Sequence, residues 1–331
     1  MAFKFHKVLV TGGAGFIGSH LAEALVRERC AVTVLDNLSS GKSANLDAIK
    51  EEITFVKGDI QDDKILNKLV KGCDAVFHQA AVVSVTQTVQ DPVTSALVND
   101  MGTIKVLDAA RRHSVRRVVL ASSSAVYGDA PQLPKTESMT PAPLSPYAVQ
   151  KLTNEYYSEL YHRLYGLETV CLRYFNVYGP RQDPSSPYSG VISIFMSKAV
   201  EKVAPVIYGD GRQTRDFVYV SDVVKANLLA AGSANAAGRV FNVGTSQSIE
   251  INSLWQMVST LALHHTRPQY AEPRPGDILH SLAGVQRAKE ILGFTPAVTF
   301  EEGLRETFNW YSNQKNDIQP AIQVQSFGPV K

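Results

Sequence analysis

The chain has 331 residues, which is enough for one large or two modest globular domains, each with its own core. Hydrophobic residues make up 44% and charged residues 19%, a composition that is ordinary for a soluble protein and excludes a disordered or fibrous chain. The formal net charge of +2 provides no global field for nucleic acid or an anionic membrane, so an anionic ligand needs a local site.

Neither a disulfide framework nor a metal site is predicted, because the three cysteines lie far apart and lack Cys-x-x-Cys or Cys/His spacing. The apolar stretch Val8–Val10 is too short for a signal peptide or a membrane span, so a cytoplasmic protein is expected. A basic cluster occurs at Arg111, Arg112, Arg116 and Arg117. Because aromatic residues do not interleave it, we interpret it as a solvated helix end and turn.

The first half of the chain alternates short β-branched runs with longer helical patterns. The predicted strands are Lys7–Thr11, Ala31–Asp36, Ile53–Val56, Ala75–His78 and Arg117–Ser122. Strands that alternate with helices predict βαβ units and a parallel sheet with helices on both faces. Right-handed crossovers then make a doubly wound α/β Rossmann fold the expectation.

The pattern changes after Asn176, where Pro and Gly residues separate short elements, as expected for a smaller α/β lobe. We therefore predict a dinucleotide-binding domain over 1–176, with segments returning to it near 214–245. The second, ligand-binding lobe is predicted over 177–213 and 246–313. The segment 314–331 lacks clear periodicity and is predicted to be a tail.

A glycine-rich run joins the first strand to the first predicted helix. Gly12, Gly15 and Gly18 stand where a tight turn, a close approach to a pyrophosphate and a free helix N-terminus are needed. The next strand ends at Asp36, about where a carboxylate would accept hydrogen bonds from an adenosine ribose. A carboxylate there repels a 2′-phosphate, and the next basic residue is Lys42, so NAD is favoured over NADP. A turn residue before a helix is the alternative interpretation of Asp36.

A possible catalytic pair begins a later helix. Ser145 suits its N-cap and Pro146 its first position, so Tyr147 lies in the first turn and Lys151 one turn further on the same face. An ammonium about 6 Å away would stabilise a phenolate by roughly 3 kcal/mol, about two pKa units, which would make the phenol a base near neutral pH. Alone, a Tyr-x-x-x-Lys match favours ordinary helix packing over catalysis.

Three hydroxyls end the preceding predicted strand, at Ser122, Ser123 and Ser124. The ends of such strands line the crevice where ligands bind in doubly wound sheets. One hydroxyl could bond a substrate alcohol and pass its proton to Tyr147. In this order, the glycine run, the serine run and the Tyr-Lys pair together favour oxidation of an alcohol by NAD.

With these motifs in place, the chain resembles the extended short-chain dehydrogenase/reductase family, and within it the nucleotide-sugar 4-epimerases, from about Lys7 to Trp310. Further matching motifs are Arg173–Arg181, Ile207–Gly211, Thr214–Val218 and Arg274–Asp277.

The resemblance implies site residues. It implies Ser123, Tyr147 and Lys151 as catalytic groups. It implies NAD contacts at Gly12, Gly15, Phe16, Ile17, Gly18, Asp36, Asn37, Gly41, Asp59, Ile60, Gln79, Ala80, Ala81, Asn99, Ser122, Tyr147, Lys151 and Tyr174. It implies substrate contacts at Ser84, Ser123, Ser124, Tyr147, Asn176, Tyr208, Arg215, Arg274, Asp277 and Ser281, with the two arginines holding a nucleoside diphosphate.

Two details of the resemblance bear on the reaction. Dehydratases of the family carry an Asp-Glu pair after the catalytic Ser/Thr, whereas this chain has Ser124-Ala125, so C4 epimerisation through a transient 4-keto sugar is expected. Members restricted to plain hexoses often have Tyr where this chain has Ser281, and Ser84 could contact an acetamido arm. UDP-GlcNAc/UDP-GalNAc interconversion is therefore favoured over UDP-glucose/UDP-galactose alone, although Thr86-Gln87 replaces the Pro-Arg common in the N-acetylhexosamine group.

Two other functions stay open at this point, a nucleotide-sugar dehydratase and a non-catalytic NAD-sensing protein, although the latter would typically have lost Tyr147 or Lys151. The resemblance also implies a homodimer through a four-helix bundle made by Pro92–Arg112 and Pro146–Tyr165. Their apolar faces could instead belong to the intramolecular core. No nucleic-acid or membrane partner is expected.

Overall fold

The computed structural model describes residues 4–184, 190–273 and 278–318. Its centre is a seven-stranded parallel sheet in the order β11-β6-β5-β4-β1-β2-β3. The strands are β1 (Lys7–Thr11), β2 (Ala31–Asp36), β3 (Ile53–Lys57), β4 (Ala75–His78), β5 (Arg117–Ser123), β6 (Glu168–Tyr174) and β11 (Arg239–Val243). This confirms the predicted doubly wound fold. The order reverses at β1, which lies between β2 and β4, and a ligand crevice is expected at the carboxyl ends of these strands.

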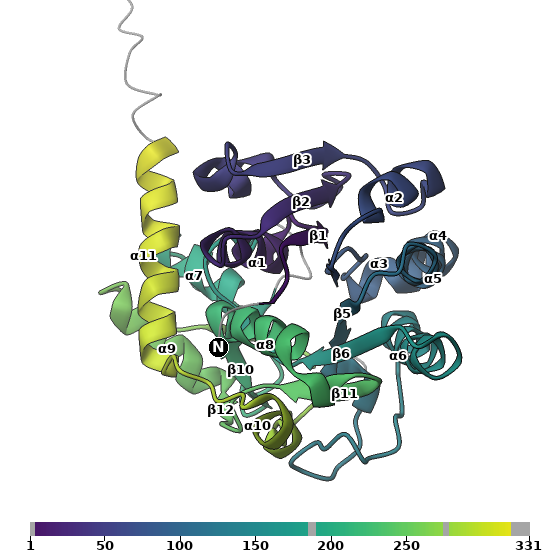
Figure 1. The fold of residues 1–331 in the computed structure, drawn as a ribbon. Coiled ribbons are helices and arrows are strands. Elements are labelled where there is room, and N and C mark those ends of the chain that lie inside the picture. Colours follow the sequence, from purple (N-terminus) through teal and green to yellow (C-terminus); the bar gives the residue numbers. More distant parts are fainter. Residues whose placement is uncertain (1–3, 185–189, 274–277, 319–331) are drawn as a thin grey trace, which may run out of the picture.

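Helices cover both faces of the sheet, because its central strands are apolar on both sides. Figure 1 shows α1 (Phe16–Arg27) and α8 (Val220–Gly232) on one face. The other face carries α2 (Asp63–Val70), α5 (Thr103–Arg112) and α6 (Pro146–Tyr165). Two separate apolar clusters lie under these two layers.

The remaining short helices connect the strands. They are η1 (Ser43–Ile49), α3 (Val85–Gln90), α4 (Pro92–Ala96), η3 (Ser124–Tyr127) and η4 (Ala234–Ala236). A further short helix, α10 (Gln286–Leu292), comes after the last strand that the structure describes. The helix expected over Pro92–Arg112 contains a π-helical segment, η2 (Leu97–Gly102), between α4 and α5.

A second lobe packs against the carboxyl edge of the sheet. It contains three two-stranded pairs and three helices. The pairs are β7 (Asn176–Tyr178) with β10 (Phe217–Tyr219), β8 (Val206–Tyr208) with β13 (Gln269–Ala271), and β9 (Thr214–Arg215) with β12 (Ile249–Glu250). The helices are α7 (Val191–Glu201), α9 (Ile251–Leu261) and α11 (Phe300–Ile318). The lobe has its own aromatic core, in which Phe195 packs edge-on against Trp255.

Two local expectations differ from the structure. Helix α11 continues to Ile318, past the start of the expected tail at 314, because its amphipathic first turns propagate the helix. Arg117 is not solvated: it is buried in β5, where its guanidinium is 2.8 Å from Glu168 on β6. In the part of the chain that the structure describes, no helix is long and apolar enough to cross a membrane, and no cluster of His, Cys, Asp or Glu could hold a metal ion.

Candidate active site

One cleft of about 940 Å³ brings most of the predicted site residues together. It lies where β1, β2, β4, β5 and β6 end and where the second lobe faces them. A volume in this range accommodates a cofactor and a small substrate. The predicted residues that line it are Gly12, Gly15, Phe16, Ile17, Gly18, Asp36, Asn37, Asp59, Ile60, Gln79, Ala80, Ala81, Ser84, Ser122, Ser123, Tyr147, Lys151, Tyr174, Asn176, Tyr208 and Arg215.

Four predicted residues are not in its lining: Gly41, Asn99, Ser124 and Ser281. Gly41 lies next to Asp36. A Cβ on Gly41 would be 2.9 Å from a carboxylate oxygen of Asp36, so a side chain there would displace that carboxylate. Ser281 is buried, and its backbone N–H donates to Thr214. Two further predicted residues, Arg274 and Asp277, lie outside the described residues.

The glycine turn fits a dinucleotide pyrophosphate. Gly12 has a φ of +68°, and a Cβ there would come within 2.6 Å of the Ala80 backbone nitrogen. A Cβ on Gly18 would collide with the Gly12 carbonyl oxygen. Helix α1 begins after Gly15 with no side-chain cap, so its first N–H groups are available to an anion. These residues can therefore hold phosphate oxygens against the backbone, as NAD requires.

A fixed carboxylate ends β2. Asp36 is buried, and its two oxygens accept hydrogen bonds from the N–H groups of Ala14 at 2.9 Å and Leu38 at 2.8 Å. Next to it, Asn37 donates to the Asp59 carboxylate at 2.8 Å. A carboxylate held in this way suits ribose hydroxyls and repels a 2′-phosphate. The turn around Asp36 thus sets the position of the carboxylate, and a place in a turn is compatible with binding a ribose.

The catalytic pair begins α6 as predicted. The Ser145 hydroxyl caps the helix by accepting from the Ala148 N–H at 3.2 Å, and Pro146 is its first residue. The Lys151 ammonium lies 5.8 Å from the centroid of the Tyr147 ring and donates to the Ala121 carbonyl at 2.8 Å. The Ser123 hydroxyl lies beside the Tyr147 phenol and lowers its pKa. The three predicted catalytic residues therefore meet at the end of β5.

The electrostatics at this pair differ from the simple expectation. Burial raises the pKa of the Tyr147 phenol, and the hydrogen bond from Ser123 lowers it in opposition. Burial also lowers the pKa of Lys151 to about 8. The predicted fall in the phenol pKa is thus not found in the chain alone, because desolvation outweighs the opposing effect of Ser123. A nearby nicotinamide cation would favour the phenolate.

Asn99 acts behind the cleft. Its side chain accepts from the Val82 N–H at 2.8 Å, donates to the Val82 carbonyl at 2.9 Å and donates to Gln150 on α6 at 2.7 Å. It thereby fixes the loop that follows β4, which carries Ala80 and Ala81 into the cleft. These hydrogen bonds occupy the side-chain amide of Asn99. The residue is buried and therefore supports the wall of the cleft without lining it.

Sequence reasoning missed several residues that line the cleft near Pro180. Lys42 forms an ion pair with Asp183 at 2.8 Å, and Arg181 pairs with Glu23 on α1. These pairs connect the two lobes across the cleft. Nothing in the sequence indicated them, since Glu23 and Arg181 are far apart in the chain. Asp216 was also missed: it is fully buried and accepts from the N–H groups of Thr245, Ser246 and Ala283.

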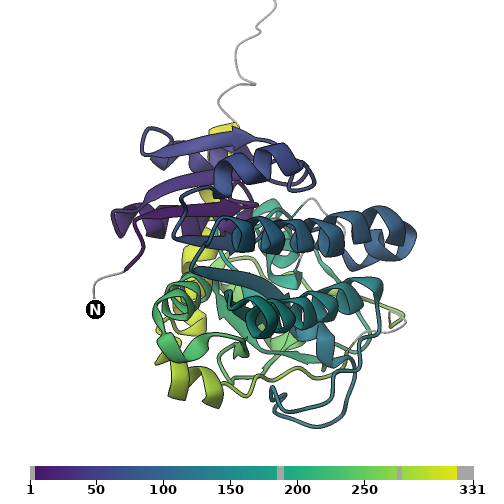
Figure 2. The ribbon, with the colours of Figure 1, turned by 45° about the vertical axis from the view of Figure 1, so that its right-hand side comes forward.

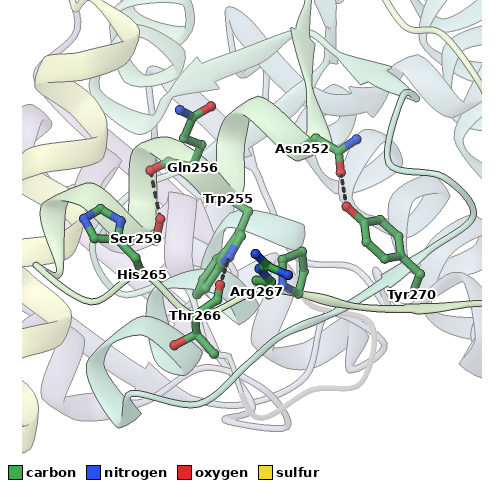
Figure 3. Close-up of a pocket in the computed structure, with 9 residues that line it drawn as sticks. Asn252, Trp255, Gln256, Ser259, His265, Thr266, Arg267 and Tyr270 are labelled. Atoms are coloured by element: carbon green, nitrogen blue, oxygen red, sulfur yellow. Dashed lines mark hydrogen bonds between the residues drawn. The ribbon is translucent and has the colours of Figure 1, made fainter.

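A second, shallower hollow lies beside α9 (Figure 3). Its polar side chains bond to their neighbours: the Trp255 indole donates to the Thr266 carbonyl at 2.8 Å, and the Tyr270 hydroxyl donates to Asn252 at 3.1 Å. The predicted catalytic residues are all in the larger cleft, which is therefore the candidate active site.

The fold and this cleft define an NAD-binding α/β enzyme with a Ser-Tyr-Lys centre. A family model, the NAD dependent epimerase/dehydratase family, matches residues 8–244. The chain belongs to this family, and its cofactor is NAD.

Three relatives place the chain within the family. A protein of Methanocaldococcus jannaschii named as a putative UDP-glucose 4-epimerase is 41% identical over 92% of this chain and 98% of its own length. The UDP-glucose 4-epimerase structure from Thermotoga maritima, with UDP-glucose, has a TM-score of 0.90 and 38% identity over 93% of this chain and 99% of its own. The UDP-N-acetylglucosamine 4-epimerase from Methanobrevibacter ruminantium M1, in complex with UDP-N-acetylmuramic acid, has a TM-score of 0.90 and 44% identity over 94% and 99%.

Proposed function

We propose that this protein reversibly interconverts UDP-GlcNAc and UDP-GalNAc by inverting C4 of the sugar through a transient 4-keto intermediate. In class it is an NAD-dependent UDP-sugar 4-epimerase, an isomerase. The observation that carries the proposal is the convergence of Ser123, Tyr147 and Lys151 at the end of β5, in a cleft that also holds the glycine turn.

The side chains divide the chemistry among them. Tyr147 takes the proton of the O4 hydroxyl, and Ser123, which lies beside Tyr147, orients that hydroxyl and relays the proton. Lys151, held by the Ala121 carbonyl, favours the phenolate. NAD, when bound, accepts hydride from C4 and returns it, so no net redox change results. The glycine turn and Asp36 would hold that cofactor through the whole cycle.

Hydride must return to the opposite face of C4, so the 4-keto sugar has to turn over inside the cleft. The side of the cleft that the second lobe forms is lined by Asn176, Tyr208 and Arg215. Arg215 provides the planar donors that suit a diphosphate, which would stay in place while the sugar turns. Elimination of water, as in a dehydratase, would need an acid and a base after Ser123, and this chain has Ser124-Ala125 there.

The choice of sugar rests on small side chains. Ser84 and Gln87 line the cleft at the start of α3, and the hydroxyl of Ser84 caps that helix by accepting from the Gln87 N–H at 3.1 Å. Its proton is then free to bond an acetamido carbonyl. Ser281 is small and buried, and its backbone N–H donates to the carbonyl of Thr214, the neighbour of Arg215 in the cleft wall, so a tyrosine there would crowd that wall. The relatives divide between epimerases named for UDP-glucose and for UDP-N-acetylglucosamine, so UDP-glucose/UDP-galactose is the second candidate.

The test is to incubate the purified protein with UDP-GlcNAc and, separately, with UDP-glucose, without added cofactor, and to follow the anomeric signals by NMR. We expect UDP-GalNAc to form from the first substrate. Conversion of UDP-glucose alone would move the assignment to the second candidate. No conversion of either UDP-hexose would refute the proposed function.

We also propose that the protein is a homodimer. Figure 2 turns α5 and α6 toward the viewer, side by side. Exposed apolar side chains lie along one face of each of two helical segments. They are Val93, Leu97 and Met101 on the continuous segment α4–η2, and Val149, Tyr156, Leu160 and Leu164 on α6. Neighbouring residues in each set are four or seven positions apart, which places them in an apolar stripe on one face of the helix. In a dimer, these two helical segments of one copy would pack against the same two segments of the other copy. The exposed apolar side chains would then be buried in a four-helix bundle.

A further inference from the structure

Three residues on one face of α6, spaced one helical turn apart, each lie against one residue of β5. Tyr147 lies close enough to Ser123 for that hydroxyl to lower its pKa, and Lys151 donates to Ala121 at 2.8 Å. One turn further, Glu155 accepts from the Ser122 hydroxyl at 2.5 Å. The third contact is not part of the Ser-Tyr-Lys centre, yet it fixes how far α6 can slide along the strand.

Glu155 is held in turn by β6. Arg173 makes a two-pronged contact with its carboxylate, through Nε at 2.8 Å and Nη2 at 2.6 Å. Both side chains are about 95% buried. The Arg173 guanidinium stacks over Tyr127 at 4.7 Å, and in the sheet Arg173 lies opposite Ser122 on one side and Asn242 on the other. The carboxylate therefore has a fixed position relative to three strands.

A buried ion pair of this kind adds little net stability compared with apolar residues of the same volume, because desolvation offsets the attraction. Its place, one helical turn from Lys151, suggests another role. We propose that Glu155 and Arg173 form a positioning pair that sets the place of α6 on β5 and helps to keep Lys151 charged during the proton transfer at C4. The proposal rests on the 4-epimerase function proposed above.

Several titratable groups surround Lys151 and could compete for this role. They are Tyr147 and Glu155 on α6, Asp100 on η2, His78 on β4 and Cys171 on β6. Burial raises the pKa of the Cys171 thiol to about 12 and lowers the pKa of His78 to about 3, so both are neutral near pH 7. Burial also raises the pKa of Asp100. Glu155 is the member of this group whose two carboxyl oxygens both bond to an arginine.

The test variant is Glu155→Gln, which keeps the shape of the side chain and removes its charge. With the carboxylate gone, the ammonium of Lys151 loses a favourable partner and gives up its proton at lower pH. We expect the falling limb of the kcat–pH profile to move down by about one pH unit. We also expect kcat to fall about tenfold or more with little change in KM, because the reacting groups shift.

The matched control is Glu168→Gln, at the other end of β6, which removes the carboxylate of the Arg117–Glu168 ion pair far from the cleft. We expect a lower midpoint of thermal unfolding and an unchanged pH profile. If Glu155→Gln leaves the falling limb where wild type has it, or if both variants change activity only in step with unfolding, the pair is merely structural and the proposal is wrong.

Should Glu155→Gln fail to fold, the double variant Glu155→Met/Arg173→Met leaves no uncompensated buried charge. We expect its limb to move in the same direction by a smaller amount, because the Arg173 cation is removed together with the carboxylate. An unshifted limb in the double variant would equally overturn the proposal. Turnover of a UDP-hexose by wild type in the same assay keeps a failure of the positioning pair distinct from a failure of the proposed function.

Discussion

Tyr147 is the residue whose role is most specific, because its phenol reaches both Ser123 and the face of α6 that carries Lys151. Its burial makes the neutral form the resting state, so the reaction depends on neighbours that appear only when the cleft is filled. Spacing along α6 revealed the pair, whereas the dominance of desolvation could be seen only in the packed structure.

We predict that Tyr147→Phe lowers kcat by roughly 10²–10⁴-fold, because the proton acceptor for O4 is lost. Bound NAD should be retained, since the aromatic ring remains. Turnover of UDP-GlcNAc and the NAD content of the purified protein are the two measurements. Tyr161→Phe, on the same helix, is the control and should retain activity. Near-normal turnover by Tyr147→Phe would exclude the phenol as the base.

A second residue-scale prediction concerns the sugar. Ser281 is buried, and its backbone N–H donates to the carbonyl of Thr214, which precedes Arg215 of the cleft lining. In Ser281→Tyr, the added ring should therefore push this segment toward the cleft and narrow it. We expect kcat/KM for UDP-GlcNAc to fall about tenfold or more relative to that for UDP-glucose. Separate NMR assays with the two substrates measure the ratio. An unchanged ratio would show that the substituent at C2 is recognised elsewhere, with Ser84 and Gln87 the nearest candidates in the lining.

At the scale of elements, the turn between β1 and α1 is the part of the site that tolerates least change. Gly12, Gly18 and the loop after β4 approach one another so closely that side chains cannot fit between them. No side chain caps the N-terminus of α1, so its first N–H groups can bind a pyrophosphate.

Gly18→Ala should therefore release NAD, since the added Cβ collides with the Gly12 carbonyl oxygen and forces the turn open. We expect the purified variant to carry much less NAD than wild type, measured by chromatography after denaturation. Gly232→Ala, at the end of α8, is the control, because a Cβ there meets nothing within 4 Å. Equal NAD contents in the two variants would contradict the assignment of this turn.

At the scale of the whole molecule, the two lobes meet around the cleft and leave the stripe on α4, η2 and α6 exposed. Leu164 is 67% exposed and Val93 is 70% exposed. Large apolar surface of this kind on a globular chain commonly marks an association site.

We predict that Leu164→Glu converts the protein from a dimer to a monomer at micromolar concentration, because a charge would enter the buried bundle. Light scattering gives the mass. Leu263→Glu is the control: Leu263 is 89% exposed, lies outside the stripe, and should leave the dimer intact. A wild-type protein of monomer mass would refute the dimer, as would a Leu164→Glu variant that stays dimeric.

The sequence by itself determined the order of strands and helices in the first half, the glycine turn, Asp36 and the Ser123, Tyr147 and Lys151 positions. These are local signals: the period of apolar residues, the cap at Ser145 and the need for glycine at a crowded turn act within a few residues of each other. They could be read without knowing what lies across the sheet.

Only the tertiary structure decided the features that depend on distant segments. The Glu155–Arg173 pair, the Lys42–Asp183 and Arg181–Glu23 contacts, and the burial of Ser281 each join parts of the chain that no pattern relates. The electrostatics of Tyr147 and Lys151 belong here as well, since desolvation is set by everything that packs around a group. Sequence spacing defines which side chains share a face, and packing decides what each of them then meets.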